Sequence, residues 1–202
     1  MDELPEFSQR VLESLRQPIE EGHVVVSRAA GSAAFPARFQ LVAAANPCRR
    51  GCASLQACGC SPGERARYLA RLSRPLLDRV DLHLEIPAVP YAQLASGTAG
   101  EPSAVIRERV VAARARQSER LAGTDVRVNA RMSGRQARRW CVVPPDATKL
   151  LALAVTRLGL SARGHDRILK VARTIADLAG GADIGAEHVS EAIQYRGLDR
   201  SP

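Results

Sequence analysis

Two acidic residues near the start of the chain and an asparagine some way along it are the first candidates for chemistry. Asp2 and Glu3 precede a helix-like segment, and Asn46 follows the apolar run 41–45. An unbroken apolar run that ends in Asn-Pro is typical of a buried strand in a parallel sheet, so we predict such a strand over residues 38–46. Ligands of open α/β sheets bind outside the carboxyl ends of the strands, which places Asn46 at a ligand crevice. The Asp-Glu pair would face the same crevice if a strand preceded it; otherwise it is a solvated helix start.

Four cysteines form a second candidate site, with the spacing C-x3-C-x5-C-x-C. Thiolates are zinc ligands, and a small loop without a core of its own gains most from a bound metal. An odd total of five cysteines is poorly suited to a closed disulfide framework. Structural zinc and free thiols both remain open, and we predict that the fifth cysteine, Cys141, lies in a core. The four candidate ligands are Cys48, Cys52, Cys58 and Cys60.

The positive charge of the chain is concentrated in one segment and is nearly all arginine. The net charge is +8, and residues 104–140 hold ten basic and three acidic side chains. Guanidinium groups suit bidentate contacts with phosphate, so this segment is a candidate nucleic-acid surface; the alternative is a solvated helix face. Its predicted first helix has an apolar stripe of Ile106, Val110, Ala113 and Leu121. The candidate DNA contacts are Arg107, Arg114 and Arg116, predicted to point outward, and Arg28 near the tip of a predicted hairpin.

The pattern of apolar, proline and glycine residues predicts an α/β segment followed by helices. In the first half we expect helices at 8–19 and 62–72, a hairpin formed by 23–28 and 32–35, and a second strand at 82–86. In the second half we expect helices that begin near residue 104 and continue at 133–141, 146–158, 164–179 and 186–195. The predicted domains are an α/β part at 1–90, which includes the cysteine-rich insertion 48–60, a linker at 91–103 and a helical domain at 104–202.

The overall composition is that of a soluble globular protein. Hydrophobic residues make up 46% of the chain and charged residues 25%. No apolar run approaches the length needed to span a bilayer, so we expect no membrane partner and a cytoplasmic location.

Several segments together resemble a known family. The sequence Asp-Glu-Leu-Pro-Glu-Phe at 2–7, the Asn-Pro at 46–47 and Pro-Leu-Leu-Asp-Arg-Val-Asp-Leu at 75–82 resemble the second half of an AAA+ ATPase core of the magnesium-chelatase-like group. Residues 160–178 and 191–196 are similar to the C-terminal signature of a competence-protein subgroup within it. The resemblance covers nearly the whole chain. It implies a partial α/β AAA+ core, with the C-terminal half of a parallel sheet, helices and a β-hairpin, followed by an all-α lid domain.

The resemblance also implies roles for particular residues, with ATP and Mg²⁺ as the cofactors. Asp2 matches the Walker B residue that holds Mg²⁺, and Glu3 matches the base that polarises the attacking water. Asn46 matches sensor 1, which hydrogen-bonds the γ-phosphate or that water. Arg79 matches an arginine finger that reaches the neighbouring subunit's nucleotide.

Alternatives remain for the arginine finger and for the sensor 2 arginine. For Arg79, the alternative is a local ion pair with Asp78 or Asp81. The lid of such an ATPase supplies a sensor 2 arginine, for which Arg167 is the first candidate and Arg163 the second.

A Walker A loop, G-x4-G-K-[ST], does not occur in the 202 residues. We therefore expect the second half of an ATPase, inactive alone. The resemblance implies a parent protein that forms a hexameric ring and couples ATP hydrolysis to DNA translocation or branch migration, in recombination and natural transformation. The alternatives are a magnesium chelatase subunit, which drives metal insertion into a porphyrin, and a non-catalytic DNA-binding or scaffold protein.

Overall fold

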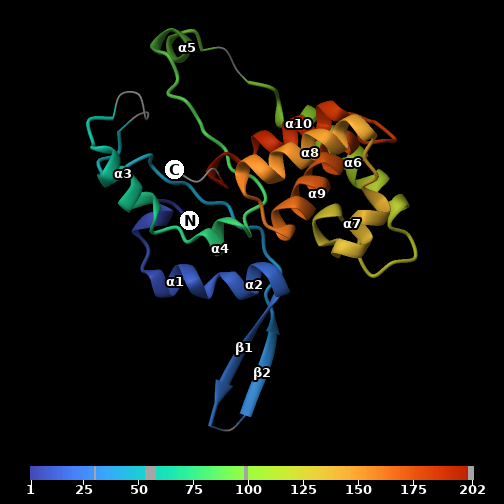
Figure 1. The fold of residues 1–202 in the computed structure, drawn as a ribbon, viewed down its shortest axis with the longest axis horizontal. Helices are drawn as coiled ribbons and strands as arrows, with labels where there is room; N and C mark the ends of the chain where they lie inside the picture. The colour runs from blue at the N-terminus through green and yellow to red at the C-terminus, as the bar shows by residue number, and fades with distance from the viewer. Residues whose placement is uncertain (30, 53–57, 98–99, 200–202) are drawn as a thin grey trace. The chain divides into compact units, whose positions relative to one another are not determined.

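The computed structural model describes residues 1–29, 31–52, 58–97 and 100–199. The chain divides into two compact units: unit 1 holds residues 1–80 and 85–88, and unit 2 holds residues 81–84 and 89 onward. Figure 1 labels the elements of both. Among the described residues, no helix combines the length and apolar composition needed to cross a bilayer. By packing, residues 81–84 belong with the helices that follow them, while the predicted boundary at residue 90 stays a prediction.

Unit 1 begins with a short 3-10 helix, η1 (Leu4–Glu6), followed by α1 (Gln9–Ser14) and α2 (Arg16–Glu21). The single helix predicted for 8–19 is therefore two helices that meet at Leu15. Ser8 caps α1 by accepting a hydrogen bond from the Val11 amide, as expected of a serine at this position. A small core joins these helices to residues further along, and it consists of Leu4, Leu12, Leu72 and Leu76.

A β-hairpin follows α2, as the sequence predicts. Strands β1 (His23–Arg28) and β2 (Gly31–Pro36) pair antiparallel in the register Val25 to Ala34. Figure 1 shows the hairpin projecting from the end of α2. Valine and phenylalanine side chains remain exposed on it, including Val25 at 48% and Phe35 at 51%. Because strands normally bury one face, this hairpin presents apolar surface that no described residue of unit 1 covers.

The buried strand predicted for residues 38–46 is wrong as stated. These residues form no regular strand, and Val42 is 70% exposed. The physical reason is the lack of neighbours, since backbone groups form a ladder only where a second extended segment lies alongside. The segment has such a partner only at Met1–Leu4, among the residues described here.

The second predicted strand, at 82–86, is also absent. Among the described residues, this segment forms one backbone hydrogen bond to a distant part of the chain, from the His83 amide to the Tyr195 carbonyl at 2.8 Å. Leu84 and Ile86 are 65% and 81% exposed. The two-stranded hairpin is thus the one sheet formed by the described residues.

Two helices complete the regular structure of unit 1. Helix α3 (Pro62–Leu69) starts with a capping box, in which the Ser61 hydroxyl accepts from the Glu64 amide and the Glu64 carboxylate accepts from the Ser61 amide. Helix α4 (Arg74–Leu77) follows it and carries the buried Leu76. The predicted helix over 62–72 is confirmed for its first eight residues.

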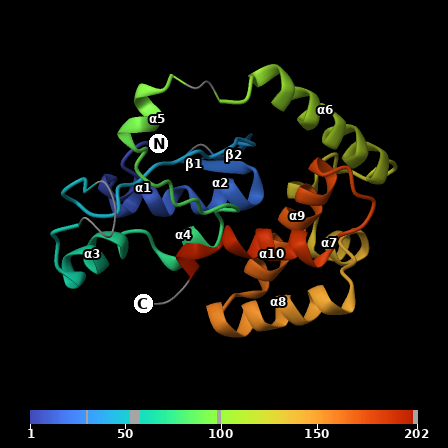
Figure 2. The ribbon, with the colours of Figure 1, turned by 90° about the horizontal axis from the view of Figure 1, so that it is seen from above.

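Unit 2 is helical, as predicted. The predicted linker contains a short exposed helix, α5 (Tyr91–Ala95). Helix α9 contacts α6, α7, α10 and η2, and α8 contacts α10; the helices α6 to α10 can be followed in Figure 2. The elements of this unit after α5 are α6 (Ser103–Arg120), η2 (Asn129–Arg131), α7 (Gly134–Trp140), α8 (Pro145–Leu158), α9 (Ala162–Leu178), α10 (Ala186–Gln194) and η3 (Gly197–Asp199).

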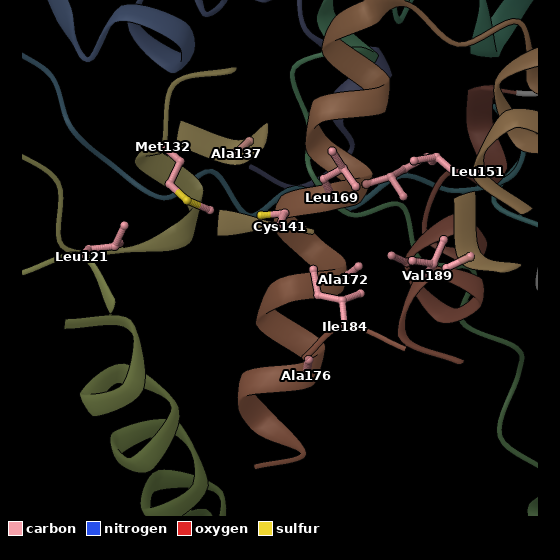
Figure 3. Packing of buried hydrophobic residues seen from close by; sticks show 13 residues of the cluster. Leu121, Met132, Ala137, Cys141, Leu151, Leu169, Ala172, Ala176, Ile184 and Val189 are labelled. Carbon is pink, nitrogen blue, oxygen red and sulfur yellow. The ribbon is translucent and has the colours of Figure 1, made fainter. Parts of the chain in front are cut away.

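The core of unit 2 is built around α9 (Figure 3). Ile168, Ala172 and Ala176 recur at spacings of four along this helix and are fully buried. Cys141 lies in the same core, which confirms the prediction, and burial raises the pKa of its thiol to about 11. On α6 the predicted stripe is only partly correct. Ala113 and Leu121 are buried, whereas Ile106 and Val110 are exposed because the first half of α6 extends beyond the core.

Candidate functional site

The structure brings the Asp-Glu pair and Asn46 to the same end of two neighbouring extended segments. The Met1 amino group donates to the Val42 carbonyl at 2.7 Å, and the Ala44 amide donates to the Met1 carbonyl at 2.9 Å. In a parallel pair of strands, one residue forms hydrogen bonds to two residues of the neighbouring strand, one on each side of the residue opposite it. Met1 has this pattern with residues 42 and 44. The two segments therefore run in the same direction. The Leu4 amide also donates to the Ala44 carbonyl at 2.9 Å, so Asp2 and Glu3 lie within the paired segment, near the end of the pairing, and Asn46 follows Ala44 by two residues.

Glu3 has an unusual backbone. Its φ of 48° and ψ of 46° place it in the left-handed region, and it is the one non-glycine residue with positive φ in the part of the chain that the structure describes. Such a conformation costs roughly 1–3 kcal/mol and clusters at functional sites. The Asp2 carboxylate accepts a hydrogen bond from the Glu3 amide at 2.9 Å. The exposed carboxylates of Asp2 and Glu3 offer the hard oxygen ligands that Mg²⁺ prefers.

Arg79 forms its ion pair with a residue far away in the chain. Its guanidinium forms an ion pair with Glu20 of α2 and donates to the Pro75 carbonyl at 2.7 Å. The Arg79 side chain is only 14% exposed. Sequence reasoning missed Glu20, because nothing in its local pattern marks it as the partner of a residue so far along the chain.

The two sensor 2 candidates lie in the first turns of α9, which begins at Ala162 after the Ser161 cap. Arg163 is exposed, whereas Arg167 is 16% exposed and forms an ion pair with Asp81 at 2.9 Å. Lys170 lies one turn further on, and its pKa is lowered by burial and by the neighbouring Arg167 charge. The N-terminal half of α9 thus carries a row of cations on one helix.

The four cysteines converge, although residues 53–57 between them lie outside the described residues. The Sγ atoms of Cys48, Cys52, Cys58 and Cys60 all lie within 4.8 Å of one another. The pKa of Cys48 is lowered to about 6, chiefly because the Cys52 amide donates to its sulfur. Burial raises the pKa of Cys60 to about 12. The cluster therefore mixes one thiol that ionises readily with one that does not.

Comparison with known proteins identifies the family of both halves. Residues 1–94 match the family model described as magnesium chelatase, subunit ChlI, and residues 100–196 match the model described as magnesium chelatase, subunit ChlI C-terminal. The chain belongs to the magnesium-chelatase-like family. This confirms the resemblance found in the sequence.

Relatives of this magnesium-chelatase-like chain match it almost from end to end. It is 46% identical over 201 residues to the competence protein ComM of Haemophilus influenzae and 45% identical over 201 residues to the uncharacterized protein YifB of Salmonella typhimurium. It is 42% identical over 196 residues to the uncharacterized protein Mb2921c of Mycobacterium bovis. The matches cover 97–99% of this chain but 39% of each relative, so the chain spans about two-fifths of their length.

The arginine-rich segment of the magnesium-chelatase-like chain is not uniform. Arg107 and Arg114 are exposed on α6, and Arg28 is exposed at the end of β1. Arg116 is half-buried and donates to the Asp177 carbonyl at 3.1 Å, so the prediction that it points outward is wrong. The carbonyl groups in the last turn of a helix lack partners within the helix, and Arg116 supplies one at the end of α9.

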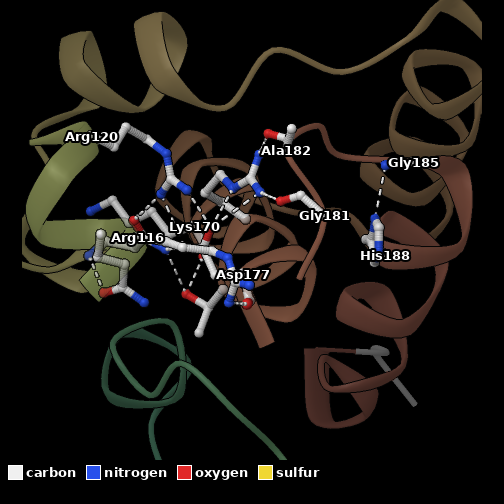
Figure 4. Close-up of polar contacts among 12 residues, drawn as sticks. Arg116, Arg120, Lys170, Asp177, Gly181, Ala182, Gly185 and His188 are labelled. Atoms are coloured by element: carbon white, nitrogen blue, oxygen red, sulfur yellow. Dashed lines mark hydrogen bonds and ion pairs between the residues drawn. The ribbon is translucent and has the colours of Figure 1, made fainter. Parts of the chain in front are cut away.

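A buried polar network in this unit was missed by the sequence analysis. The Asp177 carboxylate accepts from Arg120 at 3.0 Å, from Asn129 at 2.8 Å and from Arg173 at 3.1 Å (Figure 4). Arg173 also donates to the Gly181 and Ala182 carbonyls, both at 2.8 Å. The Arg173–Asp177 spacing of four residues on a helix was a detectable signal. The long-range donors Arg120 and Asn129 had none.

Proposed function

We propose that this chain carries the catalytic carboxylates, the sensor residues and the lid of an AAA+ ATPase that moves DNA. The observation that carries the proposal is the parallel pairing of Met1 with residues 42–44, which sets Asp2, Glu3 and Asn46 at one edge. Phosphoryl transfer requires mainly positioning and charge stabilisation, which suits a site of two carboxylates and one carboxamide.

Each residue has a stated part in the proposed reaction. Mg²⁺, held by Asp2, would neutralise charge on the phosphate oxygens of ATP. Glu3 orients the attacking water and accepts its proton, and Asn46 donates a hydrogen bond to the γ-phosphate or to that water. Arg167 or Arg163 stabilises phosphate charge from the lid. Arg79 acts on the nucleotide of a neighbouring subunit in a hexameric ring, which requires it to leave Glu20.

The exposed apolar segments support a larger sheet than the described residues form. Phe39 and Val42 in one segment, and Leu84 and Ile86 in the other, are 45–81% exposed. Central strands of parallel sheets bury such side chains on both faces. We infer that further strands of the parent protein, whose relatives are longer than this chain, complete the sheet and supply the phosphate-binding loop.

Two observations favour DNA as the substrate of the motor. A relative that matches almost the whole chain is named a competence protein, and the exposed arginines Arg107, Arg114 and Arg28 offer phosphate contacts. The family models are named for magnesium chelatase, so metal insertion into a porphyrin is the second candidate.

The proposal is tested in a protein of the relatives' full length that contains these 202 residues. We expect Mg²⁺-dependent ATP hydrolysis that is stimulated by DNA, is lost in Glu3→Gln and is retained in the control Glu119→Gln, since Glu119 is exposed on α6 of unit 2. Hydrolysis that responds to a porphyrin and not to DNA would assign the chelatase function. DNA binding without any hydrolysis would assign the scaffold function. Hydrolysis by the 202 residues alone would contradict the proposal that the phosphate-binding loop lies outside them.

A further inference from the structure

The cysteine cluster has the geometry of a site for one metal ion. In a tetrahedral zinc site the Zn–S bonds of about 2.3 Å place the sulfur atoms about 3.8 Å apart. The four Sγ atoms here lie within 4.8 Å of one another, so small side-chain rotations bring them to that separation. An iron–sulfur cluster distributes its four cysteines over two or four iron atoms, so the sulfurs bound to different iron atoms lie further apart than the sulfurs around one ion. The geometry therefore favours a single tetrahedral ion.

The surroundings of the sulfur atoms also fit a bound cation. The amides of Arg50 and Cys52 donate to the Cys48 sulfur, and the amide of Gly59 donates to the Cys52 sulfur. Amide donors of this kind stabilise the negative charge that thiolates keep when they bind a metal. Cys48 and Cys60 are buried at 1% and 6% exposure, while Cys52 and Cys58 are half-buried, so two of the four sulfur ligands are shielded from bulk water.

The ligands join two parts of unit 1 that sequence separates. Cys48 comes two residues after Asn46, and Cys60 directly precedes Ser61, the N-cap of α3. Arg65 of α3 donates to the Cys60 carbonyl at 2.7 Å, which fixes that end of the cluster to the helix. Gly51 lies between the first two ligands and close to Asn46. A Cβ atom added at Gly51 would lie 3.9 Å from the nitrogen of the Asn46 carboxamide, so the cysteine loop and the Asn46 side chain are neighbours.

We propose that Cys48, Cys52, Cys58 and Cys60 bind one structural Zn²⁺ that fastens the loop after Asn46 to the start of α3. The ion holds residues 46–51 in place and thereby positions the Asn46 side chain. Zinc binding itself does not depend on the proposed ATPase activity, because it rests on the four sulfur atoms alone.

The first test measures the metal in the native chain. Protein purified under reducing, chelator-free conditions should contain about one equivalent of zinc per chain by mass spectrometry of the metal. Replacement by Co²⁺ should give the intense visible bands of a tetrahedral tetrathiolate site. Iron in place of zinc, four freely reactive thiols without metal, or disulfides within the cluster would each overturn the proposal.

The second test uses a matched pair of variants. Cys60→Ser should lose the zinc, whereas Cys141→Ala should keep it, because Cys141 lies in the core of unit 2 and not in the cluster. Equal zinc content in the two variants would contradict the assignment. Since Cys60→Ser could fail to fold, the cobalt spectrum of the native chain decides the metal site independently.

The third test addresses the fastening of the loop. Removing zinc from the native chain with a chelator should speed amide hydrogen exchange at residues 46–51 by roughly tenfold or more, because a local opening then replaces a fixed loop. Exchange in α9 of unit 2 should not change and serves as the internal control. Unchanged exchange at 46–51 after complete zinc removal would show that the metal does not position this loop.

Discussion

Arg120 of α6 donates to both carboxylate oxygens of Asp177 in α9, across 57 residues of chain, and the Asp177 side chain is fully buried. Arg173, at 3% exposure, shares the same carboxylate. A buried carboxylate of this kind compensates two cations at once, so its removal leaves both without their partner. The pair joins α6 to α9, the helix at the centre of the core of unit 2.

We expect Asp177→Ala to destabilise unit 2 by about 3–5 kcal/mol, because it leaves buried arginine charge uncompensated. Trp140 is the single tryptophan and packs against this core, so its fluorescence during urea unfolding reports on unit 2 directly. The control is Asp183→Ala at an exposed site, expected within about 0.5 kcal/mol of the native chain. A loss below about 1 kcal/mol in Asp177→Ala would show that the network contributes little.

The Arg79–Glu20 pair allows a catalytic role to be separated from a structural one. In the full-length protein, Arg79→Ala should lower ATP hydrolysis by about 10³-fold or more if Arg79 is a finger. Glu20→Gln, which breaks the same ion pair, should keep most of the hydrolysis. Both variants lose the ion pair, and Arg79→Ala also loses the hydrogen bond to the Pro75 carbonyl, so Arg79→Ala should be the less stable of the two.

Mixed rings test whether Arg79 acts between subunits. Arg79→Ala protein mixed with Glu3→Gln protein should recover some hydrolysis, since one interface can combine an intact Glu3 with an intact Arg79. No recovery in rings shown to be mixed would mean that Arg79 acts within its own subunit or only supports the fold. Equal loss of hydrolysis in Glu20→Gln and Arg79→Ala would mean that Arg79 supports the fold through its ion pair with Glu20.

The arginines of α6 predict how DNA binding depends on salt. We expect weak, sequence-independent binding, and Arg107→Glu with Arg114→Glu should reduce the slope of log K against log salt by about 0.9 for each DNA phosphate that an arginine no longer neutralises. Arg116 is left unchanged because it bonds to the end of α9. The control Arg10→Glu with Arg38→Glu makes the same charge change at exposed sites in unit 1. The prediction fails if the two double variants bind DNA with the same slope.

Glu13 predicts a pH dependence for unit 1. The Arg16 guanidinium holds the pKa of the Glu13 carboxyl below its ordinary value, and the Ser73 hydroxyl adds a hydrogen bond at 2.7 Å. A lowered pKa in the folded state stabilises the fold above the ordinary carboxyl range, and this stabilisation is lost as pH falls through the folded pKa. Glu13→Gln should therefore be less stable than the native chain at pH 7.

The difference between Glu13→Gln and the native chain should shrink in acid. Urea midpoints of NMR signals from α1, measured between neutral and acidic pH, test this, with Glu85→Gln as the control at an exposed position. A difference that stays constant down to pH values below the ordinary carboxyl range would show that the effect is not due to the charge of Glu13.

What the sequence determined by itself is the set of local elements and the family. The hairpin at 23–36 and the helices of unit 2 depend on bonds between residues close together in the chain, so their patterns are visible in a single sequence. The motifs at 2–7, 46–47 and 75–82 were sufficient to identify the magnesium-chelatase-like family, which the comparisons confirmed.

Only the tertiary structure decided which distant residues meet. It paired Arg79 with Glu20 and Arg120 with Asp177, and it left 38–46 and 82–86 outside any sheet. Apolar pattern alone predicted strands there, but a strand needs neighbouring backbone to bond with. Partners so far apart in the chain are chosen by packing and by charge across space, and a local pattern holds no record of that choice.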